Sequence, residues 1–209
     1  MCGFATIHTS GKSVSERNIV IDNMIKSIKH RGPDGNGKIE VSDQVIMGHC
    51  RLSVIDIENG SQPMNSLDGR FSLVFNGEIY NYIELGNHLK KSGINLITNS
   101  DTEVLLQLLI KEGIDGISKL NGMFSFIFHD RKNNSWIAAR DQVGIKPLYY
   151  TQTEDELIFA SEIKAFFEHP HINAKRSQKS LQQYLSFQLC LDDHTLFKGI
   201  KKIKPGHYF

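Results

Sequence analysis

The sequence has few cysteines, little net charge and no long apolar run, and each shortage excludes a class of protein. The 209 residues include 3 cysteines, Cys2, Cys50 and Cys190. Their odd number and wide separation argue against a disulfide framework and favour a reducing, cytoplasmic setting. No stretch approaches the ~20 consecutive apolar residues that a membrane span needs, and no secretory signal pattern is present. We therefore expect no membrane partner.

The charges are nearly balanced, with 24 Lys plus Arg against 23 Asp plus Glu. This balance gives no sign of a nucleic-acid-binding surface or an acidic tail. The 9 histidines are scattered, and neither paired cysteines nor a His-Glu-x-x-His run offers metal-ligand spacing, so no metal site is expected. Gly35-Asn36-Gly37 is too short to indicate phosphate binding.

The order of the predicted elements indicates an α+β fold. Strand-like segments lie at 4–8, 37–42, 45–50, 71–76, 122–130, 135–141, 147–151 and 156–160, and helices at 16–30, 81–92, 100–113, 162–168 and 178–188. The early strands have nearly unbroken apolar runs, which suit strands covered on both faces. The predicted fold is a four-layer αββα sandwich, and the length favours a single domain over residues 1–209.

Three of these helices have recognisable faces or ends. Ile21, Met24, Ile25 and Ile28 follow the spacing of one apolar helix face. Asn81 with Glu84, and Ser100 with Glu103, are spaced like helix N-caps, and the second pair has the pattern of a capping box.

Cys2 directly follows the initiator and precedes a short apolar strand. Removal of Met1 would place a free α-amine beside the Cys2 thiol, so that one residue carries both nucleophile and base. An amine with a pKa of ~7.7–8.0 retains enough free base at neutral pH to take a thiol proton. A buried structural cysteine is the alternative.

Asn76-Gly77 stands where an apolar strand ends. The Asn76 side-chain amide and the Gly77 backbone N–H could converge on one developing oxyanion, or the pair could simply form a turn.

Two charged residues fit the ends of an α-amino acid. Arg51 at a strand end can bind a carboxylate through two hydrogen bonds. The alternative is a solvated arginine on the surface. Asp101 in the first helical turn should remain ionised and could bind an ammonium group, or only stabilise its helix. A His49-Cys50 catalytic dyad is disfavoured because neighbours on a strand face opposite sides.

Taken together, these segments resemble the glutaminase domain of asparagine synthetases. That domain is a class II glutamine amidotransferase of the N-terminal nucleophile hydrolase superfamily. The sequence Arg31-Gly32-Pro33-Asp34 resembles the form found in the asparagine-synthetase branch in particular. The matching motifs run through the whole chain in order: Cys2-Gly3, His30-Arg31-Gly32-Pro33-Asp34, Arg51-Leu52-Ser53-Val54-Ile55-Asp56, Asn76-Gly77-Glu78-Ile79-Tyr80-Asn81, Ser100-Asp101-Thr102-Glu103, Ala139-Arg140-Asp141 and Gly144-Ile145-Lys146-Pro147-Leu148-Tyr149.

The resemblance implies a set of roles around L-glutamine. The nucleophile would be Cys2, and Asn76 with Gly77 would hold the oxyanion. Substrate binding would fall to Arg51, Leu52, Val54, Ile55, Asn76, Gly77, Glu78 and Asp101, while Arg31 and Asp34 would order the wall beside Cys2. It also implies two mainly antiparallel sheets. No cofactor is implied for glutamine hydrolysis.

A complete asparagine synthetase also has an ATP-dependent domain with a Ser-Gly-Gly-x-Asp-Ser loop, which this sequence does not contain. ATP and Mg²⁺ would belong to that missing domain or to a separate synthetase subunit that receives the ammonia. The acceptor and any homo-oligomeric state stay open. Two alternatives to the glutaminase also stay open: a non-catalytic amino-acid-sensing or docking module that keeps Met1, and a stand-alone amidase for another amide.

Overall fold

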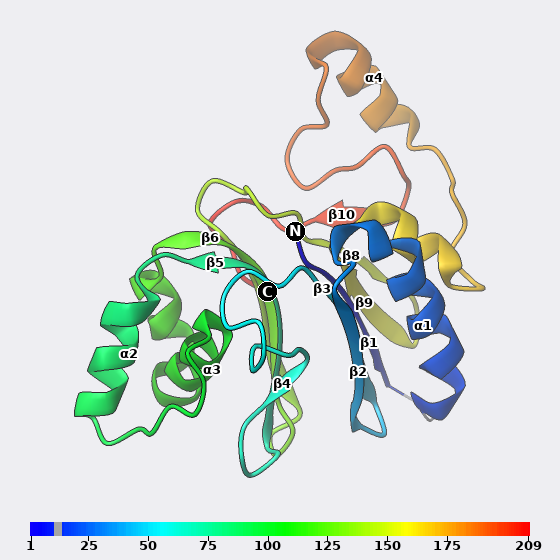
Figure 1. Ribbon diagram of the computed structural model, residues 1–209. Helices are drawn as coiled ribbons and strands as arrows, with labels where there is room; N and C mark the ends of the chain where they lie inside the picture. Colours follow the sequence, from blue (N-terminus) through cyan, green and yellow to red (C-terminus); the bar gives the residue numbers. More distant parts are fainter. Residues whose placement is uncertain (11–13) are drawn as a thin grey trace.

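The computed structural model describes residues 1–10 and 14–209 and has four layers (Figure 1). A six-stranded sheet has the order β10-β8-β9-β1-β3-β2, and a four-stranded sheet has the order β4-β5-β6-β7. Every strand pair within the two sheets is antiparallel. The sheets pack face to face, with α1 outside the larger sheet and α2 and α3 outside the smaller one (Figure 1). The predicted αββα sandwich is therefore confirmed.

The strands agree closely with the predicted segments, and two short ones were not predicted from the sequence. The two additions are β4 (Met64–Asn65) and β10 (Ile200–Lys202). The others are β1 (Gly3–Thr9), β2 (Gly35–Ser42), β3 (Val45–Arg51), β5 (Phe71–Ile79), β6 (Gly122–Asp130), β7 (Ser135–Arg140), β8 (Tyr149–Gln152) and β9 (Glu156–Ala160).

The helices agree in position but are shorter and more broken than predicted. The segment 16–30 contains parts of η1 (Val14–Arg17) and η2 (Lys29–Arg31) on either side of α1 (Asn18–Ser27). The predicted helix 162–168 is a 3₁₀ helix, η4 (Ile163–Glu168). The remaining helices are α2 (Tyr82–Lys91), α3 (Asp101–Glu112), η3 (Gly113–Lys119) and α4 (Gln178–Phe187), of which η3 was not predicted.

Three groups of buried side chains fill the spaces between the layers. One lies between α1 and the larger sheet and includes Ile21, Met24 and Ile28, which confirms the predicted apolar face. A second lies between the smaller sheet and helices α2 and α3. The third joins the facing sides of the two sheets, where Phe4 and Val74 lie among its members.

The expectation that all early strands are covered on both faces is wrong for β2. It lies at the edge of the larger sheet, and most of its residues are exposed or half-buried. Its polar residues, such as Asn36 and Lys38, suit an edge that meets water.

Two predicted helix caps also differ in detail. The Asn81 side chain does not cap α2; it accepts from the backbone N–H of Asn121 and donates to the carbonyl of Lys119. Ser100 does cap α3, by accepting from Thr102 N–H. Its supposed partner Glu103 turns instead to the residues before the cap, so the capping box is wrong.

Gly77 lies where β5 and β6 approach each other closely. A Cβ placed on it would lie 2.1 Å from the Met123 carbonyl oxygen and 2.7 Å from Phe124 Cα. These neighbours are backbone atoms of the paired strand, so they cannot move without disturbing the ladder.

We predict that Gly77→Ala lowers the free energy of unfolding by ~1–3 kcal/mol, because the added methyl group overpacks the β5–β6 pair. The matched control is Gly35→Ala, where a Cβ meets nothing within 4 Å. It should change stability by less than ~0.5 kcal/mol. Urea denaturation of both variants provides the measurement, and equal stabilities would contradict the prediction.

His49 lies between the sheets, on the face of β3 opposite Cys50. It is fully buried, and its Nε2–H donates to the carbonyl oxygen of Phe75 at 3.1 Å. Cys50 packs on the α1 side, so the two residues do face opposite ways. Burial lowers the pKa of His49 from 6.5 to about 4. The imidazole is therefore neutral in the folded protein across most of the acidic range.

This burial predicts acid destabilisation between about pH 6.5 and about pH 4. In that window the unfolded chain binds a proton at His49 that the folded chain does not, so stability falls by up to ~1.4 kcal/mol per pH unit as the pH drops. His49→Gln should flatten the dependence by this contribution, whereas replacing the exposed His171 with Gln should not. Denaturation at several pH values tests this, and parallel curves for His49→Gln and the parent chain would refute it.

Candidate active site

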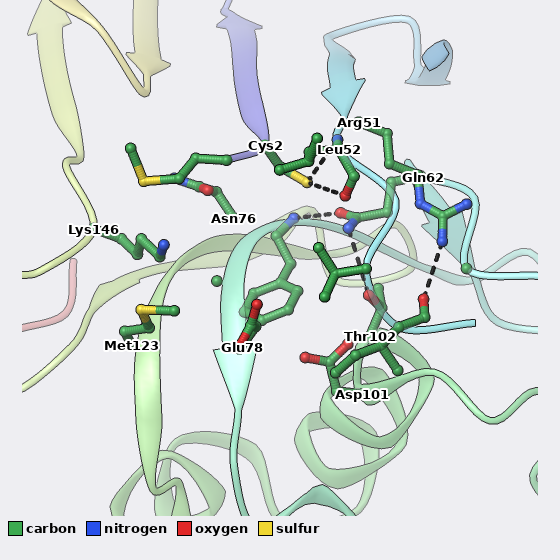
Figure 2. A pocket seen from close by; sticks show the side chains of 16 residues that line it. Cys2, Arg51, Leu52, Gln62, Asn76, Glu78, Asp101, Thr102, Met123 and Lys146 are labelled. Atoms are coloured by element: carbon green, nitrogen blue, oxygen red, sulfur yellow. Dashed lines mark hydrogen bonds between the residues drawn. The ribbon is translucent and has the colours of Figure 1, made fainter. Parts of the chain in front are cut away.

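A cavity of about 140 Å³ opens at the amino-terminal end of β1, between the ends of the two sheets. Its lining includes nine residues that the sequence places in the substrate site: Cys2, Arg51, Leu52, Val54, Ile55, Asn76, Gly77, Glu78 and Asp101. These residues come from the position just before β1, the end of β3 and the loop after it, β5 and the start of α3. Figure 2 shows side chains from each of these segments around one space, among them those of Cys2, Arg51, Asn76 and Asp101. The fold therefore brings together segments about 100 residues apart in sequence.

Cys2 lies just before β1, which is a central strand of the larger sheet. Its Sγ is 3.4 Å from the backbone nitrogen of Leu52 and 3.5 Å from the carbonyl oxygen of the same residue. Burial raises the pKa of the Cys2 thiol, while the Leu52 hydrogen bond and nearby positive charges oppose that shift. The thiol needs assistance to ionise at neutral pH.

Arg31 and Asp34 lie outside the cavity lining and contact the chain around it. Arg31 Nε donates to the Cys2 carbonyl oxygen at 2.9 Å, and its Nη1 donates to Glu162 at 3.0 Å. An Asp34 carboxylate oxygen accepts from Ser53 N–H at 2.8 Å. The Arg31 bond to the Cys2 carbonyl oxygen fixes the backbone of Cys2. The Asp34 bond to Ser53 N–H fixes the loop after β3.

Arg51 uses much of its guanidinium group to order the loop that forms one cavity wall. Nη1 donates to the Ile57 carbonyl, and Nη2 donates to the carbonyls of Ile55 and Asp56. A guanidinium has five N–H donors. Within the described part of the chain these three bonds leave two donors for a ligand carboxylate, so loop ordering and carboxylate binding are compatible.

Asn76 has a side-chain amide that is buried without a partner. The residue is 1 % exposed, and within the described residues neither Nδ2 nor Oδ1 makes a hydrogen bond. An unpaired buried amide costs about 1–3 kcal/mol, so it marks a place where a ligand can supply the missing partner. The neighbouring Gly77 lies in the same cavity wall.

Asp101 and Glu78 bring two carboxylates to the opposite part of the cavity from Cys2 (Figure 2). One Asp101 oxygen accepts from Ile79 N–H at 3.1 Å. Burial raises the pKa of Asp101 to about 6, and the Glu78 charge adds to the rise. Burial thus outweighs the helix-dipole effect expected from the sequence, although at pH 7 the ionised form still dominates by about tenfold.

Several lining residues were not predicted from the sequence. Gln62 Oε1 accepts from Phe75 N–H at 2.6 Å, and its Nε2 lies 3.4 Å from Thr102 Oγ1. Met123 and Lys146 complete the side of the cavity away from Arg51 (Figure 2). Lys146 stands in a motif that resembles the family, but nothing in its spacing shows that its side chain enters the cavity.

We searched residues 1–10 and 14–209 for metal-ligand clusters and for membrane-spanning helices. No cluster of three or more metal-ligating side chains occurs among them. In the same part of the chain, no helix has the length and apolar character required to span a bilayer.

The sequence and the fold are similar to those of known proteins. Residues 1–209 match the family described as glutamine amidotransferase domain. Asparagine synthetase [glutamine-hydrolyzing] 1 of Bacillus subtilis (strain 168) is 41 % identical over 212 residues, covering 100 % of this chain and 33 % of that protein. An amidase of Gibberella zeae is 36 % identical over 190 residues, covering 90 % of this chain and 28 % of that protein. The chain spans about a third of the length of these relatives.

Among solved structures, the glutamine phosphoribosylpyrophosphate amidotransferase of B. subtilis is similar, with a TM-score of 0.66 and 24 % identity. The similarity covers 79 % of this chain and 43 % of that chain, and at this identity it supports the fold alone. The match over the full length and the identity to the Bacillus relative establish the family. The chain belongs to the glutamine amidotransferase domain family.

Proposed function

We propose that this chain hydrolyses the side-chain amide of L-glutamine to glutamate and ammonia through a thioester on Cys2. The observation that carries the proposal is the unpaired, buried amide of Asn76 in the same cavity as the Cys2 thiol. A nucleophile next to an unused hydrogen-bond donor is the arrangement that acyl transfer requires. The family match supports the same reaction.

The charged groups of the cavity favour an α-amino acid as substrate. Arg51 offers two N–H donors to a carboxylate, and Asp101 offers an anion to an ammonium group. Glu78, Leu52, Val54 and Ile55 line the space around such a ligand.

The reaction then proceeds in two steps. The Cys2 α-amine takes the thiol proton, the thiolate attacks the amide carbon, and the resulting oxyanion accepts from Asn76 Nδ2–H and Gly77 N–H. Transfer of that proton to the leaving nitrogen releases ammonia and leaves the γ-glutamyl thioester. Water then attacks the thioester carbon, giving glutamate and restoring the thiol.

Removal of Met1 is a requirement of this mechanism. While Met1 is attached, the Cys2 nitrogen belongs to a peptide bond and has no basic lone pair. Met1 is 57 % exposed and also lines the cavity, so its removal is sterically open and enlarges the space beside the thiol.

We further propose that the ammonia passes to an ATP-dependent synthetase part, as a domain or a separate subunit, in the cytoplasm. The Bacillus relative is named as a glutamine-hydrolysing asparagine synthetase, and this chain covers only a third of it. ATP and Mg²⁺ belong to that part in this proposal, and residues 1–209 form its glutaminase domain. The free thiols of Cys2, Cys50 and Cys190 fit a reducing compartment.

A second candidate is an amidase for another amide, because one relative with this domain is named an amidase. Its substrate would also have to satisfy Arg51 and Asp101, which favours amides of α-amino acids. A panel of L-glutamine, L-asparagine and simple aliphatic amides separates the two candidates.

Asn76→Ala should reduce the turnover of glutamine by ~10²–10³-fold and change KM little, because the lost donor acts on the oxyanion. The matched control is Asn87→Ala on the exposed surface of α2, which should keep parental turnover. Steady-state kinetics with ammonia detection measures both. Near-normal turnover in Asn76→Ala would exclude the proposed oxyanion role.

Incubation with 6-diazo-5-oxo-L-norleucine, a glutamine-like electrophile, should add one group to Cys2 of the chain that lacks Met1. Peptide mapping by mass spectrometry locates the adduct. Cys2→Ala should abolish it, and Cys190→Ala should preserve it because that half-buried thiol lies outside the cavity. An unlabelled protein from which Met1 is demonstrably absent would defeat the glutaminase proposal.

A further inference from the structure

Lys146 is a buried cation inside the candidate active site to which the mechanism above gives no task. The residue is 5 % exposed, and it lines the same cavity as Cys2 and Asn76. Its amine end turns into the cavity from the side opposite Arg51 (Figure 2). In the described part of the chain, every hydrogen bond of Lys146 is made by its backbone.

The backbone of Lys146 is held from both sides. Asp141, which is fully buried, accepts from the backbone N–H groups of Phe124, Ile145 and Lys146. Arg140 Nε donates to the Lys146 carbonyl oxygen at 2.7 Å. The side chain therefore enters the cavity from a fixed point rather than from a loosely placed loop.

Stability does not explain this placement. Burial of most of a lysine side chain removes water from around its charge, and a long apolar side chain would fill the same space without that penalty. A lysine amine at a protein surface normally extends into water while only its stem is buried. The inward position of Lys146 therefore points to a task in the site.

The charges around the cavity identify that task. Four charged side chains line it: Arg51 and Lys146 are positive, and Glu78 and Asp101 are negative. Arg51 is bonded to its own loop, and Asp101 to Ile79 N–H. Lys146 is thus the lining cation whose charge is not already directed at a neighbouring backbone.

Electrostatic coupling links Lys146 to the nucleophile. Burial lowers the pKa of the Lys146 amine, while the charges of Glu78 and of the Cys2 thiolate oppose that shift. The charges that act most strongly on Cys2 are those of the chain terminus, Arg51 and Asp101. The place of the Lys146 amine in the same small cavity adds a further positive charge that favours a thiolate there.

We propose that the Lys146 ammonium acts through Cys2 as a positioning residue that favours the thiolate form of the nucleophile. This inference rests on the proposed function, since it assigns Lys146 to the thiol that performs the reaction. It extends that function by explaining how a thiol whose burial opposes ionisation becomes reactive.

Other groups that face Cys2 act alongside Lys146 and have to stay unchanged in a test. They are Arg51 at the end of β3, Arg31 on η2, Asp101 on α3, Glu78 on β5, and the Cys50 thiol on β3. Arg31 is fixed on the Cys2 carbonyl oxygen, and burial raises the pKa of Cys50 to about 11. Alkylation of Cys2 is distinguished from alkylation of Cys50 because the two thiols lie in different peptides.

The test measures ionisation of Cys2 without any glutamine chemistry. The rate of Cys2 alkylation by iodoacetamide is followed from about pH 6 to about pH 11 by mass spectrometry of the amino-terminal peptide, in chains from which Met1 has been removed. Lys146→Met should move the midpoint of this profile upward by about one pH unit. Lys146→Arg keeps the charge and should restore the parental midpoint. Lys91→Met removes an exposed charge on α2 and should leave the midpoint unchanged.

A Lys146→Met midpoint equal to that of the parent chain would overturn the proposal, and so would an equal shift in Lys146→Arg. Lys146→Gln provides a second neutral variant if the methionine chain does not give the parental circular dichroism spectrum. Labelling of the parent chain by 6-diazo-5-oxo-L-norleucine is measured in parallel. Labelling with no midpoint shift refutes the role of Lys146 alone, whereas absence of labelling refutes the glutaminase itself.

Discussion

The fixed position of Cys2, just before β1, is the constraint on which the candidate site depends. Chain termini are normally among the least ordered parts of a domain. Here β1 pairs with β3 on one side and β9 on the other, Arg31 binds the Cys2 carbonyl oxygen, and Phe4 exchanges hydrogen bonds with Ser161. The proposed mechanism requires Cys2 to keep a constant position beside its substrate, and pairing within the six-stranded sheet provides that constraint.

Both sheets contribute polar and charged residues to the cavity. The larger sheet supplies Cys2 and Arg51, and the smaller one supplies Asn76 and Gly77 from β5. Because each group stands on or beside a paired strand, reacting atoms from different sheets can be held in constant geometry. With Glu78 and Asp101 balancing the two cations, the lining suits a ligand with one charge of each sign and no net charge.

Much of the fold and of the candidate site is readable in the sequence, for physical reasons. Apolar runs and helix periodicity predict the strands and α1, since these patterns decide which face is buried. The motifs place Cys2, Arg51, Asn76 and Asp101 in one cavity because they fall at element ends that the sandwich brings together. Tertiary neighbours cannot be read so directly. They decide that β2 lies at a sheet edge and that the Asn81 side chain bonds Asn121 instead of capping α2. They also raise the pKa of Asp101.

Lys146 is the clearest example of a cavity residue that the sequence motifs alone do not identify. The motif spacing does not show where the Lys146 side chain lies, and the bonds of Asp141 and Arg140 fix the backbone from which it enters the cavity. Arg140 also donates to the Ile203 carbonyl oxygen, and the backbone of β7 pairs with His207 and Phe209. The wall of the cavity and the segment 203–209 therefore share one set of supports. A change that weakens the support of that segment would also weaken the support of Lys146 in the cavity wall, because Arg140 binds the carbonyl oxygens of both Lys146 and Ile203.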